Sequence, residues 1–527
     1  MITFNINELY ASMAIQAPNL IEITHDLQKI SFAAKDVILN SKNVAHGAIF
    51  IAIKGERFDA HDYIYDAFEQ GASLVIVNHS FYQAQMKSVS RDKRFELYKH
   101  LILSVPDTKE ALGQVAALVR SKSKATFVAL TGSSGKTSVK EMSFAILSQI
   151  GKVLATKGNF NNEIGVPLTL LSLEGDEKYA VIELGANHQG EIAYTAAMSN
   201  PQSVLINSIC KAHLEGFGSL KGVAEAKSEI FTYPQIEDLK SLSLNMPNKI
   251  EYKNNQHVIL NADIIFDALQ MQNSLNKTEK LEGEELTKFW LHHLENIKLK
   301  TLFSIDEELT KLKNNVLSQS GYKIKDISIS IAGSRFTLVT PEGHTQITLK
   351  VLGKHAISNA LAATLLCMSV GASLDAVQKG LNSIEPVNGR LYPIKLTSTT
   401  TESKWIIDDT YNANVGSMKA AASLLKELPG YKVFVAGDMA EMGPYSQVCH
   451  EEIGDFIANS QIDAVYSVGQ WSQFISSKHP NSQHFESKLA LVNTLKSILK
   501  EHAIITFLVK GSRSSAMEEI VFALQER

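Results

Sequence analysis

The chain of 527 residues has few cysteines and no long apolar run. These two features argue against a disulfide-stabilised protein, a zinc protein and a membrane-spanning protein. Its three cysteines, Cys210, Cys367 and Cys449, are odd in number and far apart, which fits neither a disulfide framework nor zinc-site spacing. No apolar stretch approaches the ~20 residues that cross a bilayer. The N-terminus lacks the basic start and apolar core of a signal peptide. We therefore expect a cytoplasmic protein that does not insert into a membrane.

The chain also lacks an excess of positive charge. Its 51 Lys and Arg residues are balanced by 55 Asp and Glu residues, which gives a formal net charge of −4. Such a balance creates no overall basic field, so we expect neither a nucleic acid nor an anionic membrane as a partner. A hydrophobic content of 45% is ordinary for a globular protein with well-formed cores. The length indicates roughly three domains.

Short apolar runs alternate with helical patterns along the chain, which predicts an α/β fold of mostly parallel sheets with helices on both faces. We expect a small α/β domain at 1–122, a central P-loop-type parallel-sheet domain at 123–384 and a Rossmann-like α/β domain at 385–527. The strands expected from the apolar runs are 48–53, 73–77, 127–130, 179–184, 203–207, 405–407, 432–436, 464–468 and 504–509.

Residues from about 264 to 300 interrupt this alternation. They are rich in Gln, Asn, Lys, Glu and Leu. We interpret them as an inserted helical excursion at the surface of the central domain, and we assign no chemistry to them.

The most informative stretch follows the first strand of the central segment. Gly132, Gly135, Lys136 and Thr137 fall in a turn between that strand and a helix. Free backbone N–H groups and the positive end of the helix dipole converge at such a turn, which suits it to bind phosphate. The lysine would reach the terminal phosphates and the threonine hydroxyl would bind Mg²⁺. The strict motif has glycine where Leu130 stands, so a Gly/Ser-rich turn with a chance lysine is the alternative interpretation.

Two further polar residues follow strands of the central segment. Glu183 lies at the end of one expected strand, and His213 comes soon after the next. Because the carboxyl ends of parallel strands meet at one edge of a sheet, we expect Thr137, Glu183 and His213 on one rim. A hydroxyl, a carboxylate and an imidazole beside a triphosphate suit a divalent metal ion. A salt bridge for Glu183 and a surface position for His213 are the ordinary alternatives.

The third segment also carries polar groups just beyond its strands. Asp408 and Asp409 open an Asn-rich turn that would hold a ribose or a substrate amine, or would cap a helix. Arg390 would pair with a phosphate, and Lys510 would hold an anionic substrate group. For each of these residues, helix capping or surface pairing stays an equal alternative.

Together these motifs resemble those of the Mur ligase family, nearly from end to end. The turn Asp-Asp-Thr-Tyr-Asn-Ala-Asn at 408–414 is the most specific, and the Asp-Asn-Pro-Arg motif of the sister ligase that adds diaminopimelate is absent. The other matching segments are 55–62, 130–141, 158–167, 183–187, 212–215, 226–230, 353–355 with Asn359, 437–443 and 510–512.

The resemblance implies an ATP-dependent carboxylate–amine ligase of peptidoglycan precursor synthesis. Such an enzyme joins D-alanyl-D-alanine to UDP-N-acetylmuramoyl-tripeptide through an acyl phosphate, with ATP and Mg²⁺ as cofactors. The first domain would hold the uridine nucleotide. We expect the chain to act as a monomer.

The resemblance also implies roles by position. Lys136, His213, Lys227 and Arg390 would take part in catalysis, and Lys227 would be carbamylated by carbon dioxide, which turns its cation into an anion able to help hold Mg²⁺. The metal-site residues implied are Thr137, Glu183, His213 and Lys227. The nucleotide contacts implied are Gly132, Ser133, Ser134, Gly135, Lys136, Thr137 and Ser138 for the phosphates, Asn359 for adenine, Asp409 for ribose and Arg390 for a phosphate. The substrate contacts implied are Ser41, Lys42, Asn161, Asn162, Tyr411, Asn412, Asn414 and Lys510.

The chain departs from the family in a few places. Asn40-Ser41-Lys42 stands where the family usually has Asp-Ser-Arg, so a point charge replaces a bidentate fork. Ala60 replaces the usual glycine of Asp-Gly-His, and Val415 replaces a proline. A sister ligase with another amino acid or a folate-like acceptor, and a nucleotide-binding scaffold without turnover, are the competing hypotheses. The intact phosphate-loop and metal-site residues favour an active ligase.

Overall fold

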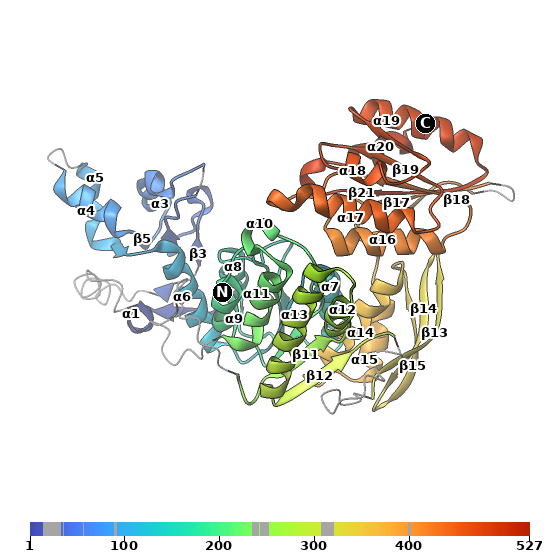
Figure 1. Cartoon of the computed structure of the whole chain (residues 1–527). Coiled ribbons are helices and arrows are strands. Elements are labelled where there is room, and N and C mark those ends of the chain that lie inside the picture. The colour runs from blue at the N-terminus through green and yellow to red at the C-terminus, as the bar shows by residue number, and fades with distance from the viewer. Residues whose placement is uncertain are drawn as a thin grey trace.

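The computed structural model describes residues 1–13, 33–34, 36–55, 57–88, 92–233, 242, 252–306, 321–398 and 402–526. Glu56, within the matching segment 55–62, lies outside them. Figure 1 shows three bodies in chain order, with the N-terminal domain at one end, the central domain in the middle and the C-terminal domain at the other end. Among the described helices, none combines the length and apolarity needed to span a bilayer.

The N-terminal domain is built on a parallel four-stranded sheet. The sheet has the order β3 (Val37–Ile38), β4 (Ile49–Ile51), β5 (Leu74–Asn78) and β6 (Ile102–Val105), so the strands expected at 48–53 and 73–77 are confirmed. A two-stranded sheet of β1 (Phe4–Asn5) and β2 (Ala33–Ala34) lies outside it. Helices α1 (Ile6–Met13), α3 (Ile64–Glu69), α4 (His79–Lys87), α5 (Lys93–Tyr98) and α6 (Thr108–Lys122) complete the domain.

Helix α6 joins this domain to the central one. It begins at an Asp107 cap that accepts backbone N–H bonds from Lys109 and Glu110, and its apolar face is buried along almost its whole length. Leu112 and Val115 belong to the same core as Ile49 of the first sheet and as the helices of the central domain. The two domains therefore share a continuous apolar core.

The central domain contains a parallel six-stranded sheet. Its order is β12 (Leu299–Phe303), β11 (His257–Asn261), β10 (Ser203–Ile206), β7 (Thr126–Thr131), β9 (Tyr179–Glu183) and β8 (Val153–Ala155). In β7, Phe127 and Ala129 face one core while Val128 and Leu130 face the other. Alternate side chains of a strand point to opposite faces, so a strand buried on both faces reads as a continuous apolar run. The strands expected at 127–130, 179–184 and 203–207 are confirmed.

Helices cover both faces of this sheet. Helices α7 (Lys136–Leu147), α14 (Lys354–Met368) and α15 (Leu374–Asn382) pack on one face, and α8 (Gly165–Leu171), α9 (Glu191–Ser199) and α11 (Leu220–Thr232) on the other, with the short α10 (Leu214–Phe217) beside α11. An antiparallel sheet is formed by β13 (Lys323–Ser330), β14 (Gly333–Thr340) and β15 (Gly343–Leu349). It packs into the core on the α7 side of the central sheet, the core that contains Val128 and Leu130. The sequence had not predicted this small sheet.

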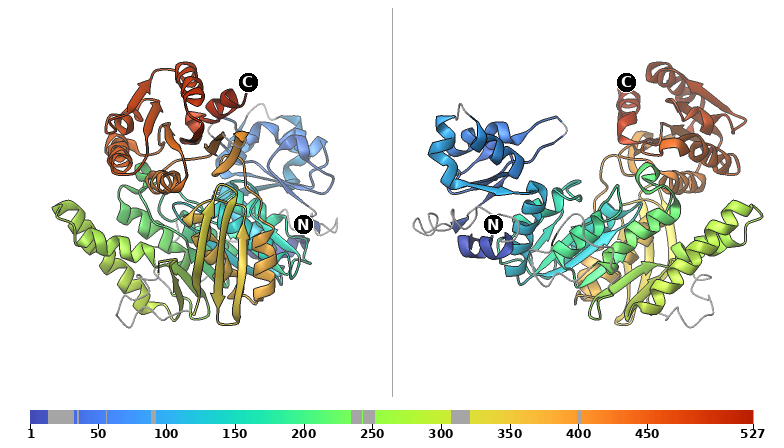
Figure 2. Two further views of the ribbon diagram at one scale, coloured as in Figure 1. Left: turned by 90° about the vertical axis from the view of Figure 1, so that its right-hand side faces the viewer. Right: turned by 60° about the vertical axis from the view of Figure 1, so that its left-hand side comes forward.

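Residues 264–300 are part of the central sheet's connectivity. They form α12 (Asp263–Gln272) and α13 (Lys277–Asn296), which link β11 to the parallel strand β12. The pair projects from the body of the domain (Figure 2), yet Leu286, Trp290 and Leu294 are buried in the main core. The stretch is helical as expected, but it is the crossover between two neighbouring strands and not an insertion outside the fold.

The C-terminal domain has a second six-stranded sheet. Its order is β16 (Tyr392–Ser398), β17 (Ser403–Asp409), β21 (Ile504–Lys510), β18 (Tyr431–Ala436), β19 (Ala464–Val468) and β20 (Ser482–Phe485), and only the edge strand β16 is antiparallel. The four strands expected here are confirmed. Helices α16 (Val415–Glu427) and α17 (Ser446–Ala458) lie on the face toward the central domain (Figure 1), and α18 (Gln473–Ser476), α19 (Lys488–Glu501) and α20 (Glu518–Gln525) complete the domain.

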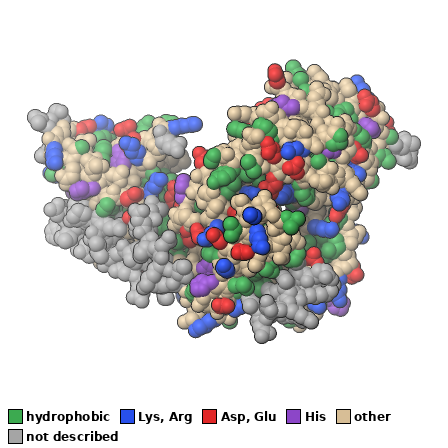
Figure 3. Space-filling view, viewed as in Figure 1, with side chains coloured by type: hydrophobic (Ala, Val, Ile, Leu, Met, Phe, Trp, Pro, Cys, Tyr) green, Lys and Arg blue, Asp and Glu red, His purple; other side chains and the backbone are tan. Residues whose placement is uncertain are grey.

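Charged side chains of both signs are intermixed over the described part of the face in Figure 3. This mixture agrees with the small net charge of −4. The chemistry of the molecule therefore depends on local clusters and not on one broad charged surface.

The role of α13 in the core leads to a stability prediction. Trp290 is 1% exposed, so Trp290→Ala should destabilise the central domain by about 3–5 kcal/mol through lost burial and a residual cavity. Urea unfolding followed by circular dichroism measures the change. Leu275, fully exposed between α12 and α13, provides the control, since Leu275→Ala should change stability by less than about 0.5 kcal/mol. Equal effects of the two substitutions would contradict a core role for α13.

Candidate active site

The turn between β7 and α7 is packed so closely that one position requires glycine. Gly135 caps α7 with a left-handed φ of 77°. A Cβ atom there would lie 2.3 Å from Nδ2 of Asn207 and 2.6 Å from Oδ1 of Asn359. Both the backbone conformation and the lack of space exclude larger residues at this position. The turn thus leads directly into the N-terminus of α7, where an anion is favoured.

Hydrogen bonds to the segment after β10 hold this turn in shape. The Ser133 N–H donates to the Ser208 carbonyl at 2.9 Å, and the Ser134 N–H donates to the Ser208 hydroxyl at 2.8 Å. The Ser133 hydroxyl lies 3.1 Å from the Cys210 carbonyl, to which it donates. Lys136 folds back over the turn, with Nζ 2.7 Å from the Gly132 carbonyl oxygen. The loop of residues 132–138, named here the phosphate loop, is therefore pre-shaped.

Several of the expected nucleotide contacts lie in or beside the phosphate loop. Burial lowers the pKa of the Lys136 ammonium, and the nearby Glu183 charge acts in the opposite direction. Thr137 and Ser138 are half-buried on the first turn of α7. Asn359 on α14 is buried and accepts a hydrogen bond of 2.9 Å from Nδ2 of Asn207. In this structure, the asparagine expected to contact adenine supports the loop at Gly135.

One carboxylate oxygen of Glu183 is buried and has no partner in the part of the chain that the structure describes. The side chain is 2% exposed at the end of β9, and its Oε1 accepts a hydrogen bond of 2.8 Å from Nδ2 of Asn161. Its Oε2 is buried and has no hydrogen-bond partner among the described residues. Burying a carboxylate oxygen without a partner costs free energy, so this atom indicates that a bound ligand supplies the missing partner. Asn162, in contrast, accepts the Gly165 N–H at 2.9 Å and thereby begins α8.

His213 contacts the C-terminal domain. It has a left-handed φ of 51° before α10, and its Nδ1 lies 2.5 Å from Oε2 of Glu441. The hydrogen bond from His213 lowers the pKa of Glu441. The Glu215 N–H also donates to the Glu441 carbonyl at 3.3 Å. The loop that follows β18 is thus docked on the histidine of the central rim.

Lys227 on α11 is 1% exposed. Among the described residues, no carboxylate forms an ion pair with it, and its ammonium lies 5.7 Å from the centre of the Phe217 ring. Burial, assisted by the positive charge of Lys136, lowers the pKa of Lys227 to about 7. The nearby Glu229 instead accepts the Gly190 N–H at 2.7 Å. A buried lysine without a counter-charge is costly, and chemistry that converts its cation would remove this cost.

Two of the four expected metal-site residues supply oxygen atoms that fit a magnesium ion. Thr137 supplies a hydroxyl oxygen and Glu183 an unpartnered carboxylate oxygen, which are ligands that Mg²⁺ prefers. His213 comes after β10, directly before α10, and the buried Lys227 lies near enough to Lys136 for their charges to interact. In this structure Thr137 accepts a hydrogen bond from Arg390 and His213 pairs with Glu441, so two of the four groups are engaged by the C-terminal domain.

Side chains of the C-terminal domain reach the phosphate loop directly. A terminal nitrogen of Arg390 donates to the Thr137 hydroxyl at 3.2 Å. Asn414 caps α16 through Ser417, while its Nδ2 donates to the Ser133 carbonyl at 3.1 Å. The structure therefore brings the expected residues Arg390 and Asn414 to the same loop.

Four other expected residues form a cluster beside that contact. Lys510 is 2% exposed, and its Nζ lies 2.7 Å from Oδ2 of Asp409 and 2.8 Å from the Asn412 carbonyl oxygen. Tyr411 is 39% exposed, and its ring lies beneath the guanidinium of Arg390. Asp409, expected to contact ribose, and Lys510, expected to bind an anionic substrate group, thus pair with each other.

Ser41 and Lys42 lie in the N-terminal domain. They form a short 3₁₀ turn that begins at Asn40, whose Oδ1 accepts the Lys42 N–H at 3.1 Å. Figure 1 shows their domain at the opposite end of the molecule from the C-terminal domain. The structure does not bring these two residues to the phosphate loop, and a ligand that contacts both regions would have to extend across the central domain.

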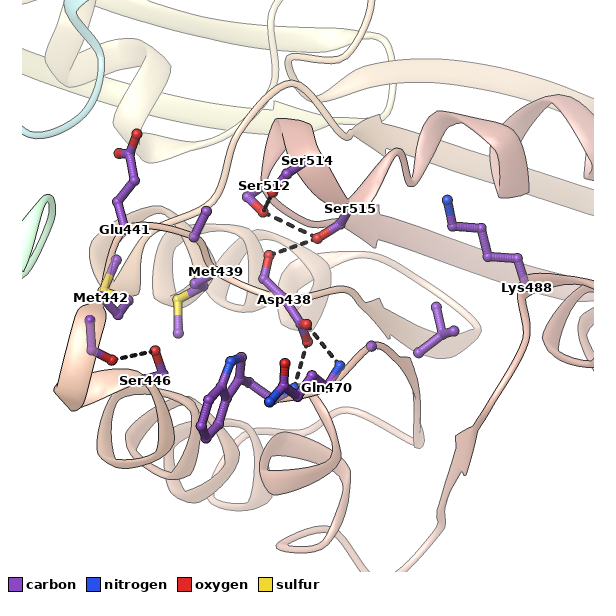
Figure 4. A pocket seen from close by; sticks show the side chains of 15 residues that line it. Asp438, Met439, Glu441, Met442, Ser446, Gln470, Lys488, Ser512, Ser514 and Ser515 are labelled. Atoms are coloured by element: carbon purple, nitrogen blue, oxygen red, sulfur yellow. Dashed lines mark hydrogen bonds between the residues drawn. The ribbon is translucent and has the colours of Figure 1, made fainter. Parts of the chain in front are cut away.

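A pocket of about 330 Å³ lies at the carboxyl ends of β18, β19 and β21. Sequence reasoning assigned none of its residues, although segment 437–443 was among those that matched the family; the carboxyl-end rule for parallel strands would have indicated it. Figure 4 shows Glu441 reaching away from the other side chains of the pocket. Asp438 fixes one wall, since its oxygens accept the N–H groups of Gln470, Trp471 and Ser472. Its lining includes Asp438, Glu441, Trp471, Lys488, Ser512 and Ser515.

Family models match three parts of the chain. The Mur ligase family catalytic domain matches residues 35–120, the Mur ligase middle domain residues 130–302, and the Mur ligase glutamate ligase domain residues 396–513. Together they cover more than half of the 527 residues.

Relatives and solved structures agree over the whole length. The UDP-N-acetylmuramoyl-tripeptide–D-alanyl-D-alanine ligase of Escherichia coli K12 is 43% identical over 95% of this chain and 96% of its own. The enzyme of the same name from Haemophilus influenzae is 36% identical over 99% of both chains. A crystal structure of MurF from Acinetobacter baumannii superposes with a TM-score of 0.76 at 29% identity, covering 100% of this chain and 99% of that one. MurF ligase from Thermotoga maritima in complex with ADP shares the fold, with a TM-score of 0.71 at 23% identity over 94% of this chain and 97% of that one.

The packing at Gly135 gives a prediction for nucleotide binding. Gly135→Ala should weaken binding of an ATP analogue at least tenfold in calorimetry, because the added Cβ would displace Asn207, Asn359 and the loop between them. Gly371→Ala serves as a control, since Gly371 has a φ of 94° but open space around it, and both variants carry about 1 kcal/mol of left-handed strain. Wild-type affinity in Gly135→Ala would contradict a binding role for the loop.

Proposed function

The chain belongs to the Mur ligase family, and we propose that it joins D-alanyl-D-alanine to UDP-N-acetylmuramoyl-tripeptide at the expense of ATP, in peptidoglycan precursor synthesis. One observation carries this proposal. The phosphate loop, the unpartnered Glu183 oxygen and the Arg390 guanidinium meet at one edge of the central sheet. That combination suits the transfer of a phosphoryl group to a carboxylate.

The proposed reaction has two steps. A carboxylate oxygen of the tripeptide attacks the γ-phosphorus of ATP, an O–P bond forms, and the bond to ADP breaks. The amine of D-alanyl-D-alanine then attacks the acyl phosphate, phosphate leaves, and the nitrogen loses a proton. Phosphoryl transfer is catalysed mainly by positioning and by neutralising the charge on the phosphate oxygens. Lys136, Arg390 and the N–H groups at the start of α7 supply that positive charge.

Thr137 and Glu183 are the proposed ligands of one magnesium ion, with His213 and Lys227 around a second. When bound, Mg²⁺ would neutralise phosphate oxygens of the nucleotide. The free oxygen of Glu183 gives this assignment its support, because it is buried without a partner. Arg390 and Glu441, which now contact Thr137 and His213, would exchange those contacts on loading.

We propose that Lys227 acts as a carbamate. Its neutral amine would add to carbon dioxide, form an N–C bond and release a proton, which leaves an anion in place of a cation. Support comes from the burial of the side chain and from the lack of a carboxylate partner among the described residues. An anion at this position would be stabilised by the charge of a metal ion on the same rim.

The substrates are proposed to span the three domains. Ser41 and Lys42 would contact the uridine nucleotide. The residues that would line the path of the tripeptide are Asn161, Asn162, Asn412, Asn414 and Lys510. The pocket beside Glu441 is the proposed site of the dipeptide, because its loop already contacts His213 on the metal rim. Adenine would lie near Asn359 and ribose near Asp409. With ATP and UDP-linked precursors as substrates, the proposed setting is the cytoplasm, and the proposed state is a monomer.

A coupled assay tests the proposed function. Purified protein with UDP-N-acetylmuramoyl-tripeptide, ATP, Mg²⁺ and D-alanyl-D-alanine should release one ADP for each peptide bond formed. Glutamate and diaminopimelate should not replace the dipeptide as the amine, and a folate-like acceptor should not replace the tripeptide as the carboxylate. Turnover only with one of those substitutes would identify a sister ligase instead. No substrate-dependent ADP release with any of them would indicate a scaffold without turnover.

Lys136 should be essential for the first step. Lys136→Ala removes a charge from the transferring phosphate, and we expect kcat to fall at least 10³-fold. Lys178→Ala is the matched control, because Lys178 is an exposed lysine at the amino end of β9 and should leave kcat unchanged. ADP release coupled to dipeptide addition at the wild-type rate in Lys136→Ala would refute this role.

Lys227→Ala should be nearly inactive and partly rescued by a short carboxylate such as acetate, because the added anion replaces the carbamate. Lys227→Arg keeps a positive charge but cannot form the carbamate, so it should be equally inactive. The ligase assay with and without acetate measures both. Full activity of either variant without acetate would rule the carbamate out.

A further inference from the structure

Arg390 extends from a short segment with unusual backbone geometry. It stands between Gly389, with a φ of 77°, and Leu391, with a φ of 51°. A left-handed conformation costs a non-glycine residue roughly 1–2 kcal/mol, so the structure must hold Leu391 in it by other contacts. The segment directly precedes β16, the edge strand of the C-terminal sheet. Arg390 therefore reaches the phosphate loop from a backbone that needs support.

Asp408 provides part of that support. Its Oδ2 accepts the Gly389 N–H at 3.1 Å, and its Oδ1 accepts both the N–H and the hydroxyl of Thr410 at 3.2 and 2.6 Å. The Tyr411 N–H donates to the Gly389 carbonyl at 3.0 Å. Asp408 is 7% exposed, so it lies beneath the segment and not in a position open to substrate.

Asp409 supports the other side of the arginine. Its Oδ1 accepts the Leu391 N–H at 3.2 Å, and its Oδ2 pairs with Lys510 at 2.7 Å. The two adjacent carboxylates thus hold the N–H groups on either side of Arg390. Hydrogen bonds to charged acceptors are among the stronger ones, which explains how the left-handed backbone persists.

Tyr411 fixes the side chain of Arg390 itself. The guanidinium carbon lies 3.9 Å from the centre of the tyrosine ring, while a terminal nitrogen donates to Thr137 at 3.2 Å. A guanidinium stacked on an aromatic face loses much of its freedom to rotate but keeps its edge N–H groups available. The stacking therefore directs those N–H groups toward the phosphate loop.

We propose that Asp408 and Tyr411 are positioning residues that present Arg390 to the phosphate being transferred. The inference rests on the proposed ligase function, and it adds a role for two residues that do not themselves touch the phosphate. Residues 389–391 and 408–411 belong to one domain, whereas Thr137 belongs to another. The arginine would thus move with the C-terminal domain as a preformed arm, and little ordering would be needed when it reaches the nucleotide.

Kinetics of Tyr411 variants test the proposal. Tyr411→Leu removes the aromatic face, and we expect kcat to fall about tenfold with each KM changed less than about threefold. Tyr411→Phe keeps the face and should retain most of the activity that Tyr411→Leu loses. Phe522→Leu, at an aromatic residue of the same domain that is 61% exposed, should leave the kinetics unchanged. A raised KM with normal kcat in Tyr411→Leu would overturn the proposal, because it would indicate direct contact with substrate.

A double-variant comparison asks whether Tyr411 acts through Arg390. The kcat of Arg390→Ala should not fall further when Tyr411→Leu is added, since the ring would have nothing left to position. Independent losses that multiply would contradict the proposal. Asp408→Asn should lower kcat as much as Tyr411→Leu does. A normal kcat in Asp408→Asn would show that Asp408 does not position Arg390. Tyr411 is half-exposed, so its variants decide the question even if Asp408→Asn does not fold.

Crystal structures of the Tyr411 variants separate this inference from the ligase function. In Tyr411→Leu the Arg390 side chain should be disordered or turned away from Thr137, and in Tyr411→Phe it should stay. An enzyme inactive as a ligase but with this structural response would refute the proposed function and keep the positioning role. An active enzyme whose Arg390 remains on Thr137 in Tyr411→Leu would refute the positioning role.

Discussion

The shape of the phosphate loop is the constraint on which the rest of the site depends. Backbone N–H groups of Ser133 and Ser134 are tied to Ser208, and Gly135 has no room for a side chain between Asn207 and Asn359. The loop is therefore formed before a nucleotide arrives, so binding needs little further ordering. The start of α7, the end of β9 and the segment after β10 all take their positions from the same parallel sheet. A parallel sheet of this kind brings the residues that follow several strands together at one edge, where a ligand can bind.

The C-terminal domain completes the site by reaching over this rim. Arg390 contacts Thr137, Asn414 contacts Ser133, and Glu441 pairs with His213. Two of these contacts engage groups that we propose to hold magnesium, so the loaded enzyme must exchange them for contacts with metal and phosphate. Docking of the domain and loading of the nucleotide are thereby linked. This linkage fits an enzyme that must exclude water from an acyl phosphate until the amine is in place.

Much of the fold could be predicted because parallel strands buried on both faces leave continuous apolar runs, as Phe127–Leu130 does in β7. The antiparallel sheet β13–β15 was missed because β13 is mostly exposed and leaves no such run. The crossover of α12 and α13 was interpreted as an insertion because its polar composition conceals a stripe that contains Trp290. In the site, local residues such as Lys136 and Glu183 were found from their places beside strands. The hydrogen bond from Gly389 to Asp408, and the pairing of Asp409 with Lys510, join segments far apart in sequence and left no local signal.

The central claim is that the nucleotide's phosphates lie in the phosphate loop with their metal ion next to Glu183. A crystal structure with a non-hydrolysable ATP analogue and Mg²⁺ tests it most directly. We expect the γ-phosphate at the start of α7, a magnesium ion bound to the Thr137 hydroxyl and to the Glu183 oxygen that now has no partner, and Arg390 turned toward the phosphate. An analogue bound elsewhere in the molecule, with the turn at 132–138 empty and Glu183 unchanged, would contradict the account.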